Sequence, residues 1–280
     1  LSKQEPFKDH AIIFVHTINP YGMAWWRRFN ENNVDLNRNF LTREQDYSGV
    51  PSGYENIRHF INPESPPPKK ERLFKLKTWN LIRKYGFNNL KQWVAEGQYE
   101  YPKAIQYGGN CLQPGPDLLL NWLDKVLKEV KQIWAIDLHT GLGPSGYDTL
   151  LVSEGTTVDD FNHFESLFPG HIESLDPNAG IGYQIVGDLH QGLIDRYDHI
   201  NWLALTQEFG TFKPIQVLQA SRTENQWTQW GKYMTEIEAR RHWSREQMLR
   251  TFNPKDVVWQ HKITSRGRIV FNAARQDLCS

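Results

Sequence analysis

The stretch from Ile133 to Gly146 constrains the fold of this chain more than any other segment. Its first part, residues 133–138, is apolar except for Asp137, as in a strand that is buried on both faces of a parallel sheet. Its second part is rich in glycine and proline and therefore predicts a loop. His139 stands where the strand ends, at the sheet edge where open α/β sheets bind ligands. The segment predicts a buried strand that ends in a ligand-binding imidazole, with a histidine packed in the core as the alternative.

Further apolar runs and amphipathic segments extend this pattern along the chain. We expect interior strands at residues 11–15, 149–153 and 202–210, and helices at 69–85 and 117–131. Helices that alternate with apolar strands are typical of a three-layer α/β/α domain. No internal repeat or linker divides the chain, so we expect one domain over residues 1–280, built on a mixed central sheet.

The composition excludes several classes of function. The 32 basic and 32 acidic residues cancel, which gives no electrostatic reason to expect binding to nucleic acid or to an anionic membrane. No apolar run is long enough to cross a bilayer. Two cysteines, Cys111 and Cys279, make neither a disulfide framework nor a metal cluster. We expect a cytoplasmic protein, and the oligomeric state stays open.

Polar side chains gather in a loop near the N-terminus and at the ends of predicted strands. The segment 27–39 holds three arginines (Arg27, Arg28 and Arg38) and five asparagines (Asn30, Asn32, Asn33, Asn37 and Asn39). Guanidinium and amide groups bind a carboxylate bidentately, although a solvated polar loop has the same composition. Glu208 ends the strand predicted at residues 202–210, as His139 ends its own strand. The sequence therefore predicts that these polar groups meet at one edge of the sheet.

Five short motifs in this order resemble those of a known family. They are Asn-Pro-Tyr-Gly at 19–22, the arginine cluster, Asp-Leu-Asn-Arg-Asn-Phe at 35–40, Asp-Leu-His-Thr-Gly at 137–141 and Glu-Phe-Gly-Thr at 208–211. The set is similar to the M14-like zinc metallocarboxypeptidase superfamily, and within it to the DUF2817 family. The related succinylglutamate desuccinylase and aspartoacylase branch also carries Asp-Leu-Asn-Arg and Asp-Leu-His. The resemblance covers roughly residues 11–212 and implies a carboxypeptidase-like (phosphorylase/hydrolase-like) fold.

The resemblance also implies a role for individual residues. His139 would be a zinc ligand, and Glu208 would be the general acid/base. Arg27 would be the guanidinium that polarises the scissile carbonyl, with Arg28 as its close competitor. Asn37 and Arg38 would receive a substrate carboxylate, and Tyr183 would be a mobile phenol. Zinc lowers the pKa of its bound water and polarises a carbonyl. The implied reaction is zinc-dependent cleavage of an amide bond next to a carboxylate-bearing residue.

One motif of the superfamily is missing. Its first two zinc ligands come from a His-x-x-Glu motif, and none of the 10 histidines in this chain has a glutamate three positions later. Catalytic zinc needs about three protein ligands, so we expect the chain to lack the N-terminal portion of the domain. Three hypotheses stay open: a carboxypeptidase-like hydrolase of peptides, a deacylase of N-acyl amino acids, and a metal-free relative that binds carboxylates without activity.

Overall fold

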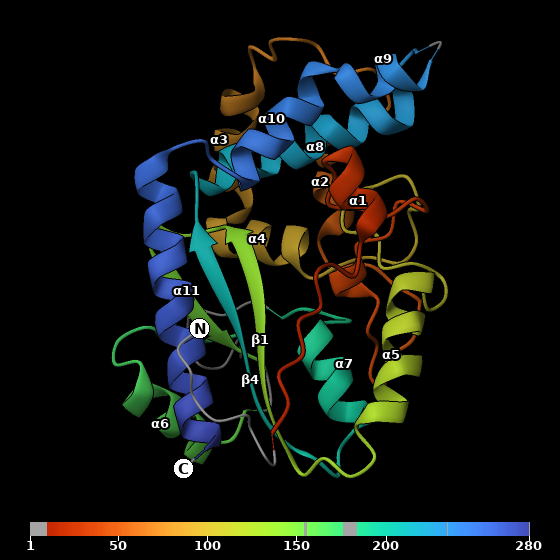
Figure 1. Ribbon diagram of the computed structural model, residues 1–280. Helices are drawn as coiled ribbons and strands as arrows, with labels where there is room; N and C mark the ends of the chain where they lie inside the picture. Colours follow the sequence, from red (N-terminus) through yellow and green to blue (C-terminus); the bar gives the residue numbers. More distant parts are fainter. Residues whose placement is uncertain (1–9, 154–155, 176–183, 234, 280) are drawn as a thin grey trace.

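The computed structural model describes residues 10–153, 156–175, 184–233 and 235–279 and confirms an α/β fold (Figure 1). Its strands are β1 (Gln132–Gly141), β2 (Asp148–Val152), β3 (Ile172–Ser174) and β4 (Asn201–Gly210). They form one sheet in the order β1-β4-β2-β3. β1 pairs with β4 and β2 with β3 in parallel, whereas β2 and β4 are antiparallel. The sheet is therefore mixed, as expected.

Helices surround this sheet. The helices of the described residues are α1 (Pro20–Trp25), η1 (Leu36–Arg38), α2 (Tyr54–Ile61), α3 (Phe74–Tyr85), α4 (Phe87–Ala95), α5 (Pro114–Val126), α6 (Val158–Leu167), α7 (Leu189–Arg196), α8 (Pro214–Trp230), α9 (Glu236–Arg241), α10 (Trp243–Phe252) and α11 (Val257–Leu278). Among the described residues, no helix is both long and apolar enough to span a membrane.

Two apolar cores, one on each face of the sheet, make the three layers. On one face, α5 and α7 pack with Ile133 and Trp202 around a core that includes Leu123 and Leu193. On the other face, α6 and α11 cover a core formed by residues of β2 and β4, including Leu205. Figure 1 shows α11 and α7 on opposite sides of β1 and β4. Alternate residues of β4 thus contribute to different cores, as the two-residue period of a strand requires.

A third apolar core lies beyond the carboxyl ends of β1 and β4. Phe29, Tyr54, Ile57, Ile61 and Ile105 are its buried members. In Figure 1, α1, α2, α8 and α10 lie at this end of the sheet. The polar loop of residues 27–39 is folded against these helices, which brings it to the end of the sheet where β1 and β4 finish.

The strand that the sequence predicts at residues 11–15 is wrong. This segment has no strand structure, and its side chains are largely exposed, up to 81% for Phe14. Figure 1 shows it running from the lower end of β1 toward α1. No backbone hydrogen bond joins it to β1 in the described part of the chain. An apolar pattern predicts that a segment can be a strand, but a strand forms only where a second backbone edge pairs with it.

Two helix boundaries also differ from the prediction. The helix expected at 117–131 runs from Pro114 to Val126. Its last predicted turn is instead used to reverse the chain before β1 begins at Gln132. The helix expected at 69–85 starts only at Phe74, after a run of three prolines and two lysines. Proline has no amide proton and restricts the preceding residue, so it delays the helix.

We expect Leu205→Ala to lower the free energy of unfolding by about 2–5 kcal/mol, because it leaves a cavity between β4 and α11. Leu205 is 0% exposed in the central strand of the core beneath α11. Chemical denaturation would measure the change. Leu118→Ala on the outer surface of α5, where the leucine is 73% exposed, is the matched control and should change stability by less than about 0.5 kcal/mol. Equal effects of the two substitutions would contradict this assignment of the core.

Candidate active site

Three ionisable side chains meet at the carboxyl ends of β1 and β4. In the parallel ladder His139 lies opposite Glu208. Asp137 and His139 are two residues apart on β1 and so share one face of the sheet. The imidazole Nε2 of His139 lies 2.7 Å from Asp137 Oδ2, and its Nδ1 lies 3.7 Å from Glu208 Oε2. The structure thus brings His139 and Glu208 together, with Asp137 behind the imidazole.

Burial and mutual charge shift the pKa of each member of this cluster. Burial raises the pKa of Glu208 above its usual value, although His139 and the amide N–H of Leu142, which donates to Oε1, act against the increase. Burial alone would lower the pKa of His139, but Asp137 and Glu208 raise it above the ordinary value. Burial would raise the pKa of Asp137, but the imidazole lowers it. Asp137 and His139 thus stabilise each other's charged forms, whereas burial opposes the charged form of Glu208.

Arg28 is the guanidinium that faces this cluster. Its charge lowers the pKa of Asp137, His139 and Glu208. Its Nε donates a hydrogen bond of 2.7 Å to Asp35 Oδ2. Asp35 is buried, and burial would raise its pKa, but Arg28 and Arg38 lower it. Asp35 also accepts from the amide of Asn37 at the start of η1. This carboxylate holds Arg28 in place.

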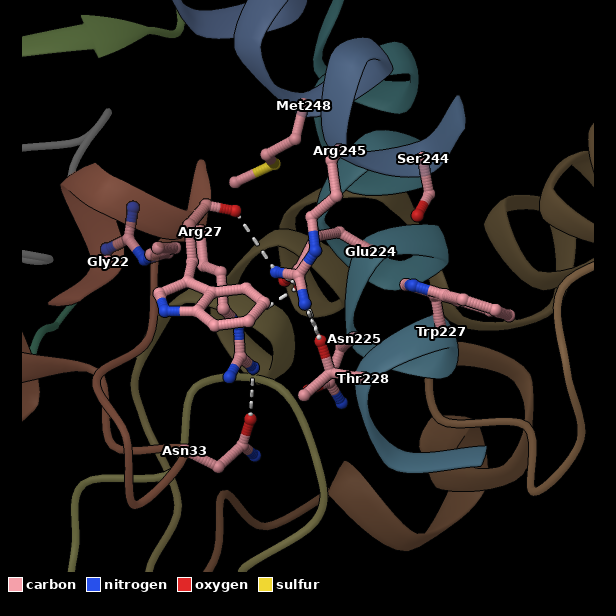
Figure 2. A network of polar contacts seen from close by, with 12 residues as sticks. Gly22, Arg27, Asn33, Glu224, Asn225, Trp227, Thr228, Ser244, Arg245 and Met248 are labelled. Carbon is pink, nitrogen blue, oxygen red and sulfur yellow. Dashed lines mark hydrogen bonds and ion pairs between the residues drawn. The ribbon is translucent and has the colours of Figure 1, made fainter. Parts of the chain in front are cut away.

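Arg27 points elsewhere, into a buried network beside α8 and α10 (Figure 2). Its Nε lies 3.0 Å from Glu224 Oε1, and its Nη2 donates to Asn33 Oδ1. Arg245 donates to the same oxygen of Glu224 and to Thr228. Glu224 is 0% exposed. Because the Arg27 guanidinium is paired there, the geometry favours Arg28 as the one that could act at the cluster.

The predicted carboxylate-binding pair contacts the chain's own backbone. The guanidinium of Arg38 donates to the carbonyl oxygens of Ala95 and Asn37. The side-chain oxygen of Asn37 accepts from the amide of Leu189 at the start of α7. A substrate carboxylate at Arg38 would have to compete with these carbonyl groups. The remaining predicted site residue, Tyr183, lies outside the described residues.

The cluster opens on a large hollow of about 2380 Å³. His139, Glu208, Arg28, Asn37 and Arg38 all line it. A small-molecule site usually has a volume of about 300–1,000 Å³. The hollow thus gives a substrate ample access to the cluster, and it continues along β1 well beyond the ionisable groups.

The described residues do not by themselves fit a catalytic zinc site. The Nε2 of His139 is held by Asp137, as a carboxylate commonly orients a histidine ligand, and its Nδ1 faces Glu208. Among the described residues, however, no group of three or more His, Cys, Asp or Glu side chains is arranged to hold a metal ion. One imidazole and one nearby carboxylate fall short of the ligands that catalytic zinc uses.

Sequence reasoning missed two partners that orient the arginines. Asp35 belongs to the Asp-Leu-Asn-Arg motif, so its position in that motif was the available signal. Glu224 had none, because it follows Arg27 by nearly two hundred residues and lies in a helix with several buried polar side chains. Only the packing of α8 against the loop of residues 27–39 shows that Glu224 binds Arg27 in this loop.

The sequence matches the family described as "Protein of unknown function (DUF2817)" over residues 2–266. The chain belongs to the DUF2817 family. No curated protein and no solved structure matches it. The family match extends over the whole cluster, from Arg28 to Glu208, so the candidate active site lies within the part of the chain that this DUF2817 protein shares with its family.

We expect Asp137→Asn to lower the pKa of His139, because the imidazolium loses the partly buried carboxylate that raises this pKa. NMR titration of the imidazole would measure this shift. In the folded wild-type protein the pKa of His139 is raised above its unfolded value of about 6.5. The pair therefore stabilises the folded protein fully below about pH 6.5, and this stabilisation is lost as the pH rises through the pKa of the folded state. Asp198→Asn on the surface is the control and should leave His139 unchanged. An unaltered titration in Asp137→Asn would contradict the pairing.

We expect Glu224→Gln to destabilise the protein by about 3 kcal/mol or more, because Arg27 and Arg245 would be left buried without their shared carboxylate. Glu246→Gln, which breaks an exposed ion pair with Arg250 on α10, should cost less than about 1 kcal/mol. Urea denaturation of both variants gives the comparison. Similar small losses would show that the network in Figure 2 does not carry a buried charge interaction.

Proposed function

We propose that this DUF2817 protein is a hydrolase that cleaves an amide bond next to a carboxylate-bearing residue, as a relative of the M14-like zinc metallocarboxypeptidases. The observation that supports the proposal best is the largely buried carboxyl group of Glu208, whose Oε2 lies 3.7 Å from Nδ1 of His139, with both side chains on the wall of the hollow. A buried carboxyl with a raised pKa beside an open cavity is a strong candidate for proton transfer. The proposed substrate is a peptide or an N-acyl amino acid with a free carboxylate.

In this proposal, Glu208 takes a proton from the attacking water and passes it to the leaving amine. Burial raises the pKa of Glu208, which makes the carboxylate a better proton acceptor than an exposed glutamate. Arg28, held by Asp35, faces the oxyanion that develops on the carbonyl. One such donor contributes about 3 kcal/mol to the stabilisation of a transition state. Arg28 takes this role instead of Arg27, which is paired with Glu224.

The proposal includes a zinc ion, but none of the residue roles above depends on it. His139 is the described residue that would bind it, through the ring nitrogen that faces Glu208, with Asp137 as the orienting carboxylate. The short ligand set favours a second candidate function, a metal-free protein that binds carboxylates without hydrolysing them. Two exposed, unpaired cysteines fit the cytoplasm, which we propose as the compartment.

We expect Glu208→Gln to lower kcat by about 10²–10⁴-fold, because the amide cannot accept the proton. The assay offers peptides and N-acyl amino acids in separate reactions, with zinc present, and follows release of the amine. Glu236→Gln at the exposed start of α9 is the control and should keep wild-type turnover. Turnover that survives in Glu208→Gln would place the base elsewhere, and absence of turnover in every wild-type reaction would favour the binding protein.

We expect this chain to bind zinc weakly and His139→Ala to remove that binding, because one imidazole and one carboxylate are too few for a tight site. Equilibrium dialysis followed by metal analysis would measure the affinity. His261→Ala on α11 is the matched control, because that histidine is exposed. Tight binding of one zinc ion per chain would show that further ligands meet at His139.

A further inference from the structure

The peptide bond between Gly141 and Leu142 forms hydrogen bonds on both of its sides. Its carbonyl oxygen accepts from the amide of Thr211 at 3.2 Å and from the Thr211 hydroxyl at 2.9 Å. Its N–H group, which belongs to Leu142, donates to Oε1 of Glu208 at 2.9 Å. Thr211 is 4% exposed. This single peptide unit therefore connects a buried threonine just after β4 to the carboxyl group of the ionisable cluster.

The two bonds to the carbonyl oxygen act on Glu208 through the geometry of the peptide. Because a peptide unit is planar, fixing the direction of its carbonyl group also fixes the direction of its N–H group. A peptide whose carbonyl accepts hydrogen bonds is also polarised, so its N–H becomes a stronger donor. The amide of residue 211 donates whichever side chain is present there, but the second bond needs the hydroxyl group. The identity of Thr211 therefore affects how firmly Leu142 binds the carboxyl group.

The loop that follows β1 is also held against the end of β4 by other contacts. The amide of Gly146 and the indole Nε1 of Trp259 both donate to the carbonyl of Gly210. A Cβ atom on Gly210 would clash with the carbonyl oxygen of Pro144, so this close approach requires a glycine. These contacts restrict rotation of the peptide, and the hydroxyl of Thr211 completes them at the start of the loop.

The two oxygens of Glu208 consequently have different surroundings. Oε1 accepts from Leu142, whereas Oε2 lies 3.7 Å from Nδ1 of His139. Anchoring of Oε1 limits rotation of the carboxyl group and keeps Oε2 beside the imidazole. A general base has to lie within hydrogen-bond reach of the proton that it takes. Since a displacement of about 1 Å can lower a rate by about 10²-fold, the anchor matters for the reaction.

We propose that Thr211 is a positioning residue for Glu208. Its hydroxyl group fixes the peptide between Gly141 and Leu142, the N–H of this peptide fixes Oε1, and Oε2 is the oxygen that exchanges the proton. The last step rests on the proposed function, because it assigns proton transfer to Glu208. The chain of hydrogen bonds from Thr211 to Glu208 does not rest on it and can be measured without turnover.

The first test compares Thr211→Val, which has a similar shape but no hydroxyl, with Thr211→Ser, which keeps the hydroxyl. NMR measures hydrogen exchange of the Leu142 amide in each variant. Thr78→Val on α3 is the matched control, because the hydroxyl of Thr78 is also buried and donates to the carbonyl of Phe74 at 2.8 Å. Thr211→Val should speed the exchange about fivefold or more, whereas Thr211→Ser and Thr78→Val should stay within about twofold of the wild type. Exchange at the wild-type rate in Thr211→Val would overturn the proposal.

A double-mutant comparison tests whether Thr211 acts through the same bond as Glu208. Glu208→Ala should also speed exchange of the Leu142 amide, because it removes the acceptor. In this background Thr211→Val should add little, since the amide has already lost the partner toward which the threonine directs it. Two effects that simply multiply would overturn the proposal, because the residues would then act on the amide independently.

Kinetics test the part of the proposal that depends on the reaction. With the peptides and N-acyl amino acids used for Glu208→Gln, Thr211→Val should lower kcat about tenfold or more at an unchanged KM, and Thr211→Ser should restore most of it. Faster exchange of Leu142 with a wild-type kcat would overturn the positioning role and leave the hydrolase intact. Absence of turnover in every wild-type reaction would reject the hydrolase and the role of Oε2, whereas the exchange measurements would still decide whether Thr211 holds Glu208.

Discussion

The parallel pairing of β1 with β4 is the interaction on which the rest of the structure depends. Its register places His139 opposite Glu208, and a shift by one residue would turn one of these side chains to the other face of the sheet. Both strands are held between two apolar cores, which oppose such a shift because it would expose Leu205 and its neighbours. The position of the ionisable cluster is therefore a consequence of how the core packs.

Two glutamates near this end of the sheet, Glu224 and Glu208, differ in the charged groups that surround them. Glu224 lies inside a network where Arg27 and Arg245 compensate its charge, so its contribution is to join α8, α10 and the loop of residues 27–39. Glu208 instead has a histidine as its nearest charged partner, and its other carboxylate oxygen accepts from a backbone amide. A carboxyl with weaker compensation keeps a raised pKa. This difference in surroundings, rather than in residue type, is the basis of the proton-transfer role proposed for Glu208.

Much of the sheet and part of the site could be predicted from the sequence. The apolar runs gave β1, β2 and β4, and the polar residues at the ends of β1 and β4 predicted that His139 and Glu208 would meet. The choice between Arg27 and Arg28 could not be predicted. The backbone of Trp26 is left-handed (φ 53°), and the two consecutive arginines after it extend to different partners. Those partners, Glu224 and Asp35, are selected by tertiary packing.

The wrong strand at residues 11–15 and the free edge of β1 have the same physical cause. The sequence pattern correctly marks both segments as apolar and suited to extended structure, but each lacks a backbone neighbour on the side that faces the hollow. A segment of strand-forming residues therefore stays unpaired wherever the described fold places no second backbone edge beside it.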